Sequence, residues 1–129
     1  MFDRLAKALQ LFQIIIFLST VILTTLETNS GVYANQMVLS ETAISDRMNK
    51  LSGWTHQEKQ IVRTFKFKNF VEAVDFVNRL VEPAEKAGHH PDLALSYNKV
   101  TVSLSTHDAG GLTQKDFDLA EIVSKLYSN

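Results

Sequence analysis

The sequence of 129 residues contains no cysteine and has no excess of either charge, with 13 Lys and Arg against 14 Asp and Glu. The missing cysteine excludes disulfide bonds, zinc sites built on thiolates and a cysteine nucleophile, but it leaves the redox compartment open. The balanced charge gives no electrostatic footprint for nucleic acid and no polybasic membrane surface. The sequence also lacks a phosphate-binding loop, a serine nucleophile elbow and a dinucleotide fingerprint, so it gives no support to these enzyme classes.

The amino-terminal segment, residues 1–34, differs from the rest of the chain. Arg4 and Lys7 make its start weakly positive, and residues 11–26 form a charge-free and mostly apolar run. Small or modest side chains follow at 32–34, where a signal peptidase would cut. This is the three-part layout of a secretory signal peptide. The apolar run is shorter than the roughly 20 residues that span a bilayer comfortably.

Three interpretations of residues 1–34 stay open. Cleavage after Ala34 predicts export to a periplasm or lumen, whereas retention predicts an anchor that contacts the membrane only through residues 11–26. A translation start at Met37 predicts a cytoplasmic protein, with the upstream stretch a mispredicted extension. In each case, length and composition predict one folded domain at residues 36–129.

The residue pattern of this domain predicts elements in the order helix, strand, strand, helix, strand, strand, helix. Helices are expected at 40–51, 70–87 and 113–127, and strands at 54–56, 61–67, 93–97 and 100–106. Antiparallel strands in sequential pairs with amphipathic helices predict an α+β fold, in which a four-stranded antiparallel sheet carries three helices on one face. An exposed edge rich in Ser and Thr can pair with a second copy, so we expect an oligomer.

The helix expected at 70–87 has the clearest pattern, because its apolar residues recur at three- and four-residue steps. Pro83 lies inside this pattern. It is expected to kink or end the helix near residues 79–82, since proline lacks a backbone donor. Gly88 terminates any continuation of the helix.

Three of the four histidines lie in one short stretch, with His89 and His90 before Pro91 and His107 in a Thr-His-Asp sequence after the last strand. Histidine is the side chain whose ordinary pKa lies closest to neutral pH. Adjacent residues in an extended segment point to opposite sides, so His89 and His90 can face one pocket only if the backbone turns there. The fourth histidine, His56, is isolated and is not assigned to this cluster.

Three interpretations of the histidine cluster compete. Three histidines can bind zinc, but neighbouring histidines rarely bind one ion together, and no Asp or Glu stands at a typical ligand spacing. The histidines can instead be capping or surface residues. The pattern favours the third interpretation, proton-transfer catalysis, in which a positioned acid and base typically each supply a factor of about 10²–10⁴. One histidine would protonate a leaving hydroxyl while another accepts a proton from the substrate.

The neighbouring residues have both functional and structural interpretations. Glu85 either holds a histidine in its productive tautomer or is simply solvated at the helix end. Asp116 forms a capping-box pattern with Thr113, and capping alone explains it. Asp108 either raises the pKa of the histidine beside it or caps the following turn. Trp54 and Tyr97 can wall a flat ring, but aromatic residues in strands more often belong to the core.

Several segments of the sequence resemble the pterin-4a-carbinolamine dehydratase family. The matching segments are Glu85-x-x-x-His89-His90-Pro91-Asp92, Tyr97-Asn98-Lys99-Val100, the run from Leu104 to Thr113 with Asp116, and upstream Gly53-Trp54 and the run from Phe65 to Phe70. The similarity covers residues 39–126, nearly all of the predicted domain. A motif of this length is far more specific than a pair of histidines.

The resemblance implies an α+β sandwich that forms homodimers or homotetramers and needs neither a metal nor a bound cofactor. It implies removal of water from 4a-hydroxytetrahydrobiopterin to give the quinonoid dihydropterin, which recycles the tetrahydrobiopterin of aromatic amino acid hydroxylases. His89, His90 and His107 match the family's catalytic histidines. The resemblance also places further residues at the substrate, namely Glu85, Asp116, Trp54 and Pro91.

Within this site, the resemblance suggests that His107 and His89 are the acid–base partners and that His90 is a positioning residue. The chain departs from the family at Leu93, where animal members carry an aromatic residue, and at Pro83 in the central helix. The apolar amino-terminal segment is also foreign to a cytosolic pterin enzyme.

A binding or assembly role is the alternative function. Some relatives act as dimerisation partners of a homeodomain transcription factor, and other dehydratase-like proteins assist RuBisCO assembly. Such relatives can lose the active-site histidines, which this chain keeps. An exported protein would also have no transcription factor to bind.

Overall fold

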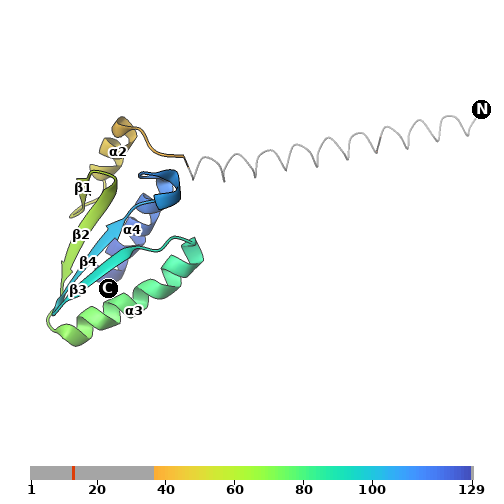
Figure 1. Cartoon of the computed structure of the whole chain (residues 1–129). Coiled ribbons are helices and arrows are strands. Elements are labelled where there is room, and N and C mark those ends of the chain that lie inside the picture. Colours follow the sequence, from red (N-terminus) through yellow and green to blue (C-terminus); the bar gives the residue numbers. More distant parts are fainter. Residues whose placement is uncertain (1–12, 14–36, 129) are drawn as a thin grey trace, which may run out of the picture. The chain divides into compact units, whose positions relative to one another are not determined.

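The computed structural model describes Gln13 and residues 37–128 (Figure 1). Apart from Gln13, the predicted signal-peptide-like or membrane-anchor segment at residues 1–34 lies outside the described residues. Across the described part of the chain, no helix is both long and apolar enough to cross a membrane. The predicted division into this segment and a domain at 36–129 therefore stays a prediction.

The described domain has the predicted order of helices and strands (Figure 1). The elements are α2 (Glu41–Met48), β1 (Thr55–Gln57), β2 (Gln60–Lys66), α3 (Phe70–Ala87), β3 (Asp92–Ser96), β4 (Lys99–Leu104), the short 3₁₀ helix η1 (His107–Ala109) and α4 (Gln114–Ser128). The four strands form one antiparallel sheet in the order β1-β2-β4-β3. The predicted α+β fold is confirmed.

One face of the sheet carries the core. Side chains alternate along a strand, so Ile61 and Phe65 of β2 point inward and are at most 1% exposed, whereas Thr64 points outward. All three α-helices add residues to the same core cluster. These include Ile44 of α2, Phe76 and Leu80 of α3, and Phe117 and Val123 of α4. The sheet and the helices thus share a single hydrophobic core.

Helix α3 does not end near Pro83, which corrects one of the two sequence-based expectations, whereas the expected kink stays a prediction. The helix continues to Ala87. Proline removes one backbone donor, but Leu80 and Ala84 on either side of it are buried, and this packing keeps the helix intact. The helix ends at Gly88, as predicted. Gly88 adopts the left-handed conformation with a φ of 54°, which turns the chain directly into His89.

The second hairpin is shifted from its predicted position. Strands β3 and β4 begin one residue earlier than expected, and the turn lies at Tyr97 and Asn98, where Tyr97 has a φ of 52°. The amide of Asn98 donates to the Phe67 carbonyl at 2.7 Å and holds the turn in place. Strand β4 also ends early, because Thr106 forms an isolated bridge with Gly111 and the chain between them coils into η1.

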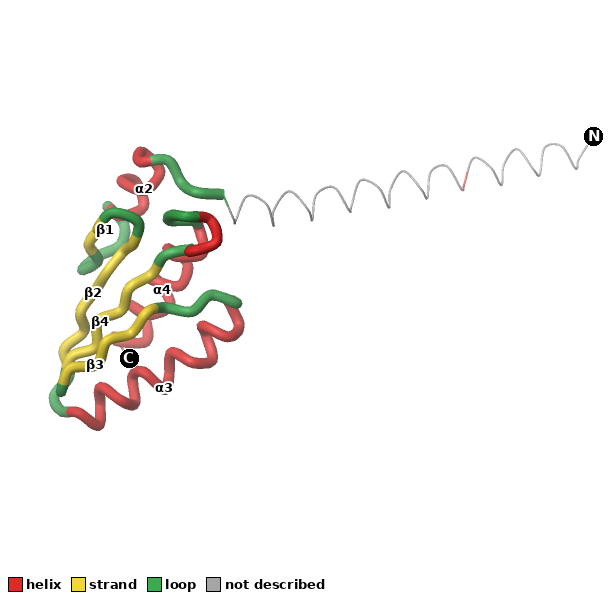
Figure 2. The backbone as a smooth tube through the Cα atoms, in the orientation of Figure 1, coloured by secondary structure: helices red, strands yellow, loops and turns green. Residues whose placement is uncertain are grey.

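The loop from α3 to β3 and the turn after β4 lie at the same end of the sheet (Figure 2). Asp92, at the start of β3, pairs with Ser103 near the end of β4. The antiparallel register therefore brings the segment that begins with His89 next to the segment that contains His107.

Candidate active site

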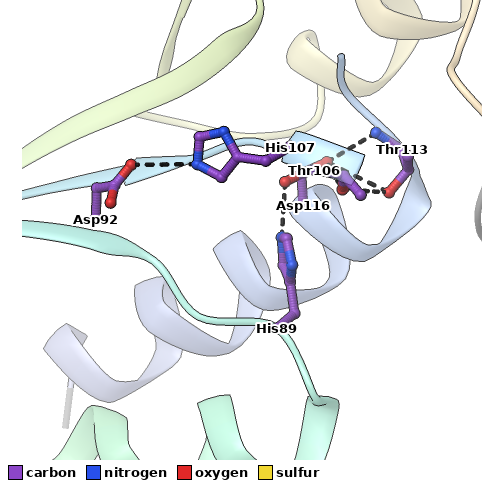
Figure 3. Close-up of polar contacts among 6 residues, drawn as sticks. All are labelled: His89, Asp92, Thr106, His107, Thr113 and Asp116. Atoms are coloured by element: carbon purple, nitrogen blue, oxygen red, sulfur yellow. Dashed lines mark hydrogen bonds and ion pairs between the residues drawn. The ribbon is translucent and has the colours of Figure 1, made fainter. Parts of the chain in front are cut away.

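His89 is the buried member of the histidine cluster. It follows the left-handed cap of α3, and its backbone N–H donates to the Ala84 carbonyl at 3.1 Å. Its side chain points at α4, where Nε2 lies 2.7 Å from Oδ1 of Asp116 (Figure 3). His89 is 8% exposed and Asp116 is 0% exposed. The contact therefore lies away from bulk water.

Asp116 is held by donors from two segments besides His89 (Figure 3). The Thr113 backbone N–H donates to its Oδ2 at 2.7 Å, which is the contact expected of a capping box at the start of α4. The Thr106 hydroxyl donates to the same oxygen at 2.8 Å. The carboxylate thus caps α4 and contacts His89 at once, so its structural and functional interpretations coexist.

The donors around Asp116 keep its carboxyl ionised. Burial by itself would raise the pKa of Asp116, but the hydrogen bonds from His89, the Thr113 backbone and Thr106, together with the His89 charge, bring the pKa below its ordinary value. An ionised carboxylate only accepts hydrogen bonds. His89 must then carry its proton on Nε2, and in neutral His89 the lone pair lies on Nδ1.

The Nδ1 atom of His89 is the candidate proton acceptor. It makes no hydrogen bond within the described part of the chain, where no side-chain polar atom is both fully buried and without a partner. The small exposed part of the His89 side chain, 9%, therefore includes this nitrogen. His89 thus has one nitrogen held by Asp116, whereas the other is partly exposed and has no hydrogen-bond partner among the described residues.

His107 is the exposed member of the cluster. It begins η1, and its Nε2 lies 3.7 Å from Oδ2 of Asp92 (Figure 3). Both side chains are more than three-quarters exposed, so this contact contributes little to stability. The expected partner Asp108 makes no ion pair with His107 in the structure. His107 lines a polar pocket of about 320 Å³ together with Ser105 and the β1–β2 hairpin.

His90 contacts a carboxylate of its own. Its Nε2 lies 2.8 Å from Oε1 of Glu85, and the two side chains are 64% and 69% exposed. Glu85 therefore contacts a histidine, as one of its two interpretations expects, and is also largely exposed to solvent, as the other expects. His90 and Pro91 line an apolar pocket of about 170 Å³ with Leu93 and the facing side of α3. His90 and His107 therefore border different pockets.

Two predicted aromatic walls lie elsewhere. Trp54 is 5% exposed and belongs to the core cluster. Its indole N–H donates to Ser124 Oγ at 2.9 Å. Ser124 lies eight positions after Asp116 on α4, which is about 12 Å along the helix axis. Tyr97 lies at the β3–β4 turn and is 73% exposed. The structure therefore places Trp54 in the core, as the second interpretation expects, whereas the core interpretation is wrong for Tyr97.

Two residues that the sequence pattern included without a role contribute to the site. Thr106 contacts Asp116, and Asp92 contacts His107. Their position in the histidine-bearing segments could have indicated a role in the site. The sequence did not indicate their partners, because Asp116 lies 10 residues from Thr106 and His107 lies 15 residues from Asp92. Among the described residues, no three His, Asp or Glu side chains converge to form a metal site. The expected absence of a metal stays a prediction.

The comparisons with known proteins agree on one family. The family model described as "Pterin 4 alpha carbinolamine dehydratase" matches residues 37–126. A protein from Nostoc sp. that is provisionally named a pterin-4-alpha-carbinolamine dehydratase is 60% identical over 89 residues, which is 69% of this chain and 96% of that protein. A relative from Cyanothece sp. with the same name is 62% identical over 91 residues, covering 69% of this chain and 92% of the relative.

A solved structure has the same fold. The "transcriptional coactivator/pterin dehydratase" from Brucella melitensis is 34% identical to this chain and superposes with a TM-score of 0.67. The match covers 70% of this chain and 98% of the Brucella protein. The region of similarity therefore spans nearly the whole of that relative.

Proposed function

The chain belongs to the pterin-4a-carbinolamine dehydratase family, and we propose that it is a hydro-lyase that removes water from 4a-hydroxytetrahydrobiopterin to give the quinonoid dihydropterin. The C4a–O bond breaks as the hydroxyl gains a proton and leaves as water, while N5 loses a proton. One proton is donated and one is accepted, so the reaction needs an acid and a base but no redox partner. In this role the protein would recycle tetrahydrobiopterin.

The single observation that carries the proposal is the buried contact between His89 and Asp116. A histidine whose Nε2 donates to an ionised carboxylate can accept a proton at Nδ1, because the carboxylate stabilises the resulting imidazolium. We assign His89 as the base that takes the N5 proton. Asp116 is fully buried, which supports a role behind His89 in place of the direct substrate contact expected from the sequence.

His107 is the proposed acid. It is exposed, lies beside a polar pocket, and is one residue from Thr106, whose side chain contacts Asp116. A substrate between the two segments would place its C4a hydroxyl toward His107 and its N5 toward His89. His90, held by Glu85 and next to Pro91, is assigned to substrate positioning.

The test is stopped-flow dehydration of 4a-hydroxytetrahydropterin by the full chain and its His89→Ala and His107→Ala variants. Each substitution is expected to lower the rate by roughly 10²- to 10⁴-fold, the usual contribution of a positioned acid or base. The control is His56→Ala, because within the described residues the His56 side chain makes one hydrogen bond, to the Glu58 carbonyl at 2.8 Å. Full activity in the double variant of His89 and His107 would refute the site assignment.

A homodimer or homotetramer is the proposed assembly. Strand β3 is an edge of the sheet, and all five of its residues are exposed. Leu93 and Leu95 on this strand are each 40% exposed although their register partners Val102 and Val100 are buried. Exposed strand edges pair readily with other strands. Sedimentation of the wild-type protein beside Leu95→Lys tests this, and a monomeric wild type would refute it.

A binding role is the second candidate, and the name of the Brucella relative is what favours it, since that name joins coactivation to pterin dehydratase. Dehydratase-inactive variants separate the two roles. A coactivator or assembly role would survive His89→Ala with His107→Ala, whereas the enzymatic role would not.

Export stays a proposal that rests on residues 1–34 alone, and amino-terminal sequencing of the mature protein tests it.

A further inference from the structure

We infer that Thr106 is a positioning residue of the dehydration: its hydroxyl orients the Asp116 carboxylate, and through that carboxylate it holds His89 with the proton on Nε2. The inference rests on the proposed function for its catalytic consequence. Its structural part, the control of the His89 tautomer, stands on the hydrogen bonds alone. Figure 3 shows the chain of contacts from Thr113 and Thr106 through Asp116 to His89.

Counting protons assigns the direction of each bond. A threonine hydroxyl has one proton to donate. Thr106 Oγ1 donates it to Asp116 Oδ2 at 2.8 Å, so the 2.8 Å contact between Thr106 and Thr113 must use the Thr113 proton. The Thr113 hydroxyl itself is 3.4 Å from Asp116 Oδ2, too long for a strong bond. Within the described chain, Thr106 is therefore the one hydroxyl with a short bond to the carboxylate.

These bonds decide which oxygen meets His89. The Thr113 backbone N–H and the Thr106 hydroxyl both donate to Oδ2, at 2.7 and 2.8 Å. Oδ1 is left to accept from His89 Nε2 at 2.7 Å. Two donors on one oxygen resist rotation of the carboxylate, whereas a single backbone donor would not. Without the Thr106 hydroxyl, His89 would lose its fixed orientation.

Thr106 also anchors the segment that carries His107. Its backbone N–H donates to the Gly111 carbonyl at 3.2 Å, and its carbonyl accepts from Ala109 and Gly110. The backbone of Thr106 thus holds the segment of the proposed acid, His107. Its hydroxyl holds Asp116, which contacts the proposed base, His89. Thr106→Val removes the hydroxyl and keeps the backbone hydrogen bonds, so this substitution separates the contribution of the hydroxyl from that of the backbone.

The experiment compares Thr106→Val, Thr106→Ser and Thr113→Val in the full chain. Thr106→Val is expected to lower kcat by about 10- to 100-fold with little change in KM, the size expected for loss of a hydrogen bond to a charged group. Thr106→Ser keeps the hydroxyl and is expected to restore kcat to within about threefold. Thr113→Val leaves the short Thr106–Asp116 bond in place and is expected to have the smaller effect.

The pH profile gives a readout that loss of folding would not reproduce. The Thr106 bond lowers the pKa of Asp116, and His89 is the only titratable side chain among its causes. Removing that bond raises this pKa, so the part of the acid limb of kcat that follows protonation of Asp116 is expected to move to higher pH in Thr106→Val. Thr64→Val is the matched control, because among the described residues the Thr64 hydroxyl hydrogen-bonds with Thr101 alone, on the outer face of the sheet at 2.9 Å.

Nitrogen-15 NMR of the His89 ring separates this inference from the proposed function. Wild type and Thr106→Ser are expected to show the Nε2–H tautomer at high pH, and Thr106→Val a mixture. That pattern in a protein without dehydratase activity would refute the proposed function and leave the tautomer control standing. An unchanged tautomer and acid limb in Thr106→Val would overturn the inference. If Thr106→Val does not fold, Thr106→Ala is read in the same way.

Discussion

Two short histidine–carboxylate contacts in the described part of the chain have nearly equal lengths and very different surroundings. His89 lies 2.7 Å from Asp116 with side chains 9% and 0% exposed, whereas His90 lies 2.8 Å from Glu85 with side chains 64% and 69% exposed. Water and ions screen the exposed pair, and holding two mobile side chains together costs it entropy. Distance alone therefore does not show which pair matters, because burial decides how strongly the charges act on each other.

The positions of the two carboxylates on their helices add to the difference between the pairs. Asp116 lies in the first turn of α4 and accepts a hydrogen bond from a free backbone N–H there, where a negative charge is favoured. Glu85 lies near the carboxyl end of α3, where a negative charge is disfavoured. The fold thus stabilises one carboxylate and leaves the other to solvent.

The largest expected effect is that breaking the buried pair lowers both kcat and the free energy of unfolding, whereas breaking the exposed pair changes stability little. Asp116→Asn leaves His89 beside a neutral amide, so we expect kcat to fall roughly 10²- to 10⁴-fold and the free energy of unfolding to fall by about 3 kcal/mol. Glu85→Gln is expected to cost less than about 1 kcal/mol. Stopped-flow assays and urea unfolding measure both. Equal losses in the two variants would show that burial does not separate the pairs.

Acid unfolding is expected to depend on the buried pair. The folded-state pKa of Asp116 is lowered, so below neutral pH the unfolded state binds the proton first. The stabilisation is complete above the unfolded pKa of about 3.9 and is lost as the pH falls through the folded pKa. Urea unfolding from pH 6 to 3 should show this loss in wild type and Glu85→Gln but much less of it in Asp116→Asn. Parallel curves for all three proteins would contradict it.

Salt is expected to weaken the exposed pair of His90 and Glu85. It is expected to leave the buried pair of His89 and Asp116 unchanged. At 1 M salt the screening length falls to about 3 Å, so the small stability difference between wild type and Glu85→Gln should vanish. The difference between wild type and Asp116→Asn should remain, since water and ions do not reach that contact. Repeating the urea series at low and high salt checks this. A salt-sensitive effect at Asp116 would place that pair in solvent.

The smallest expected effect concerns the contact between His107 and Asp92. It is 3.7 Å long and both side chains are more than three-quarters exposed, so Asp92→Asn should change the free energy of unfolding by less than about 0.5 kcal/mol. Any effect on kcat should be below about threefold, because His107 keeps its place on η1 through the backbone of Thr106. A larger stability loss would show that this contact is stronger than its exposure indicates.

Much of the fold was predictable because its signals are local. The three- and four-residue apolar spacing of α3, the alternation along β4 and the turn at Gly88 each depend on neighbouring residues, and each was confirmed. The expected end of the helix at Pro83 was wrong, since packing of the buried residues around it outweighs the lost donor, whereas the expected kink stays a prediction. The shifted turn at Tyr97 depends on the bond from Asn98 to Phe67, which lies 31 residues away.

The sequence alone determined the order of the elements and the presence of three histidines at the ends of two of them. It also offered Glu85 as a residue that holds a histidine, and the structure identifies that histidine as His90, five residues along the chain. Only the tertiary structure decided that Asp116 contacts His89, which is 27 residues distant, and that Trp54 packs in the core. The physical reason is that burial and long-range pairing follow from how α4 packs against α3 within the shared core, which no local pattern encodes.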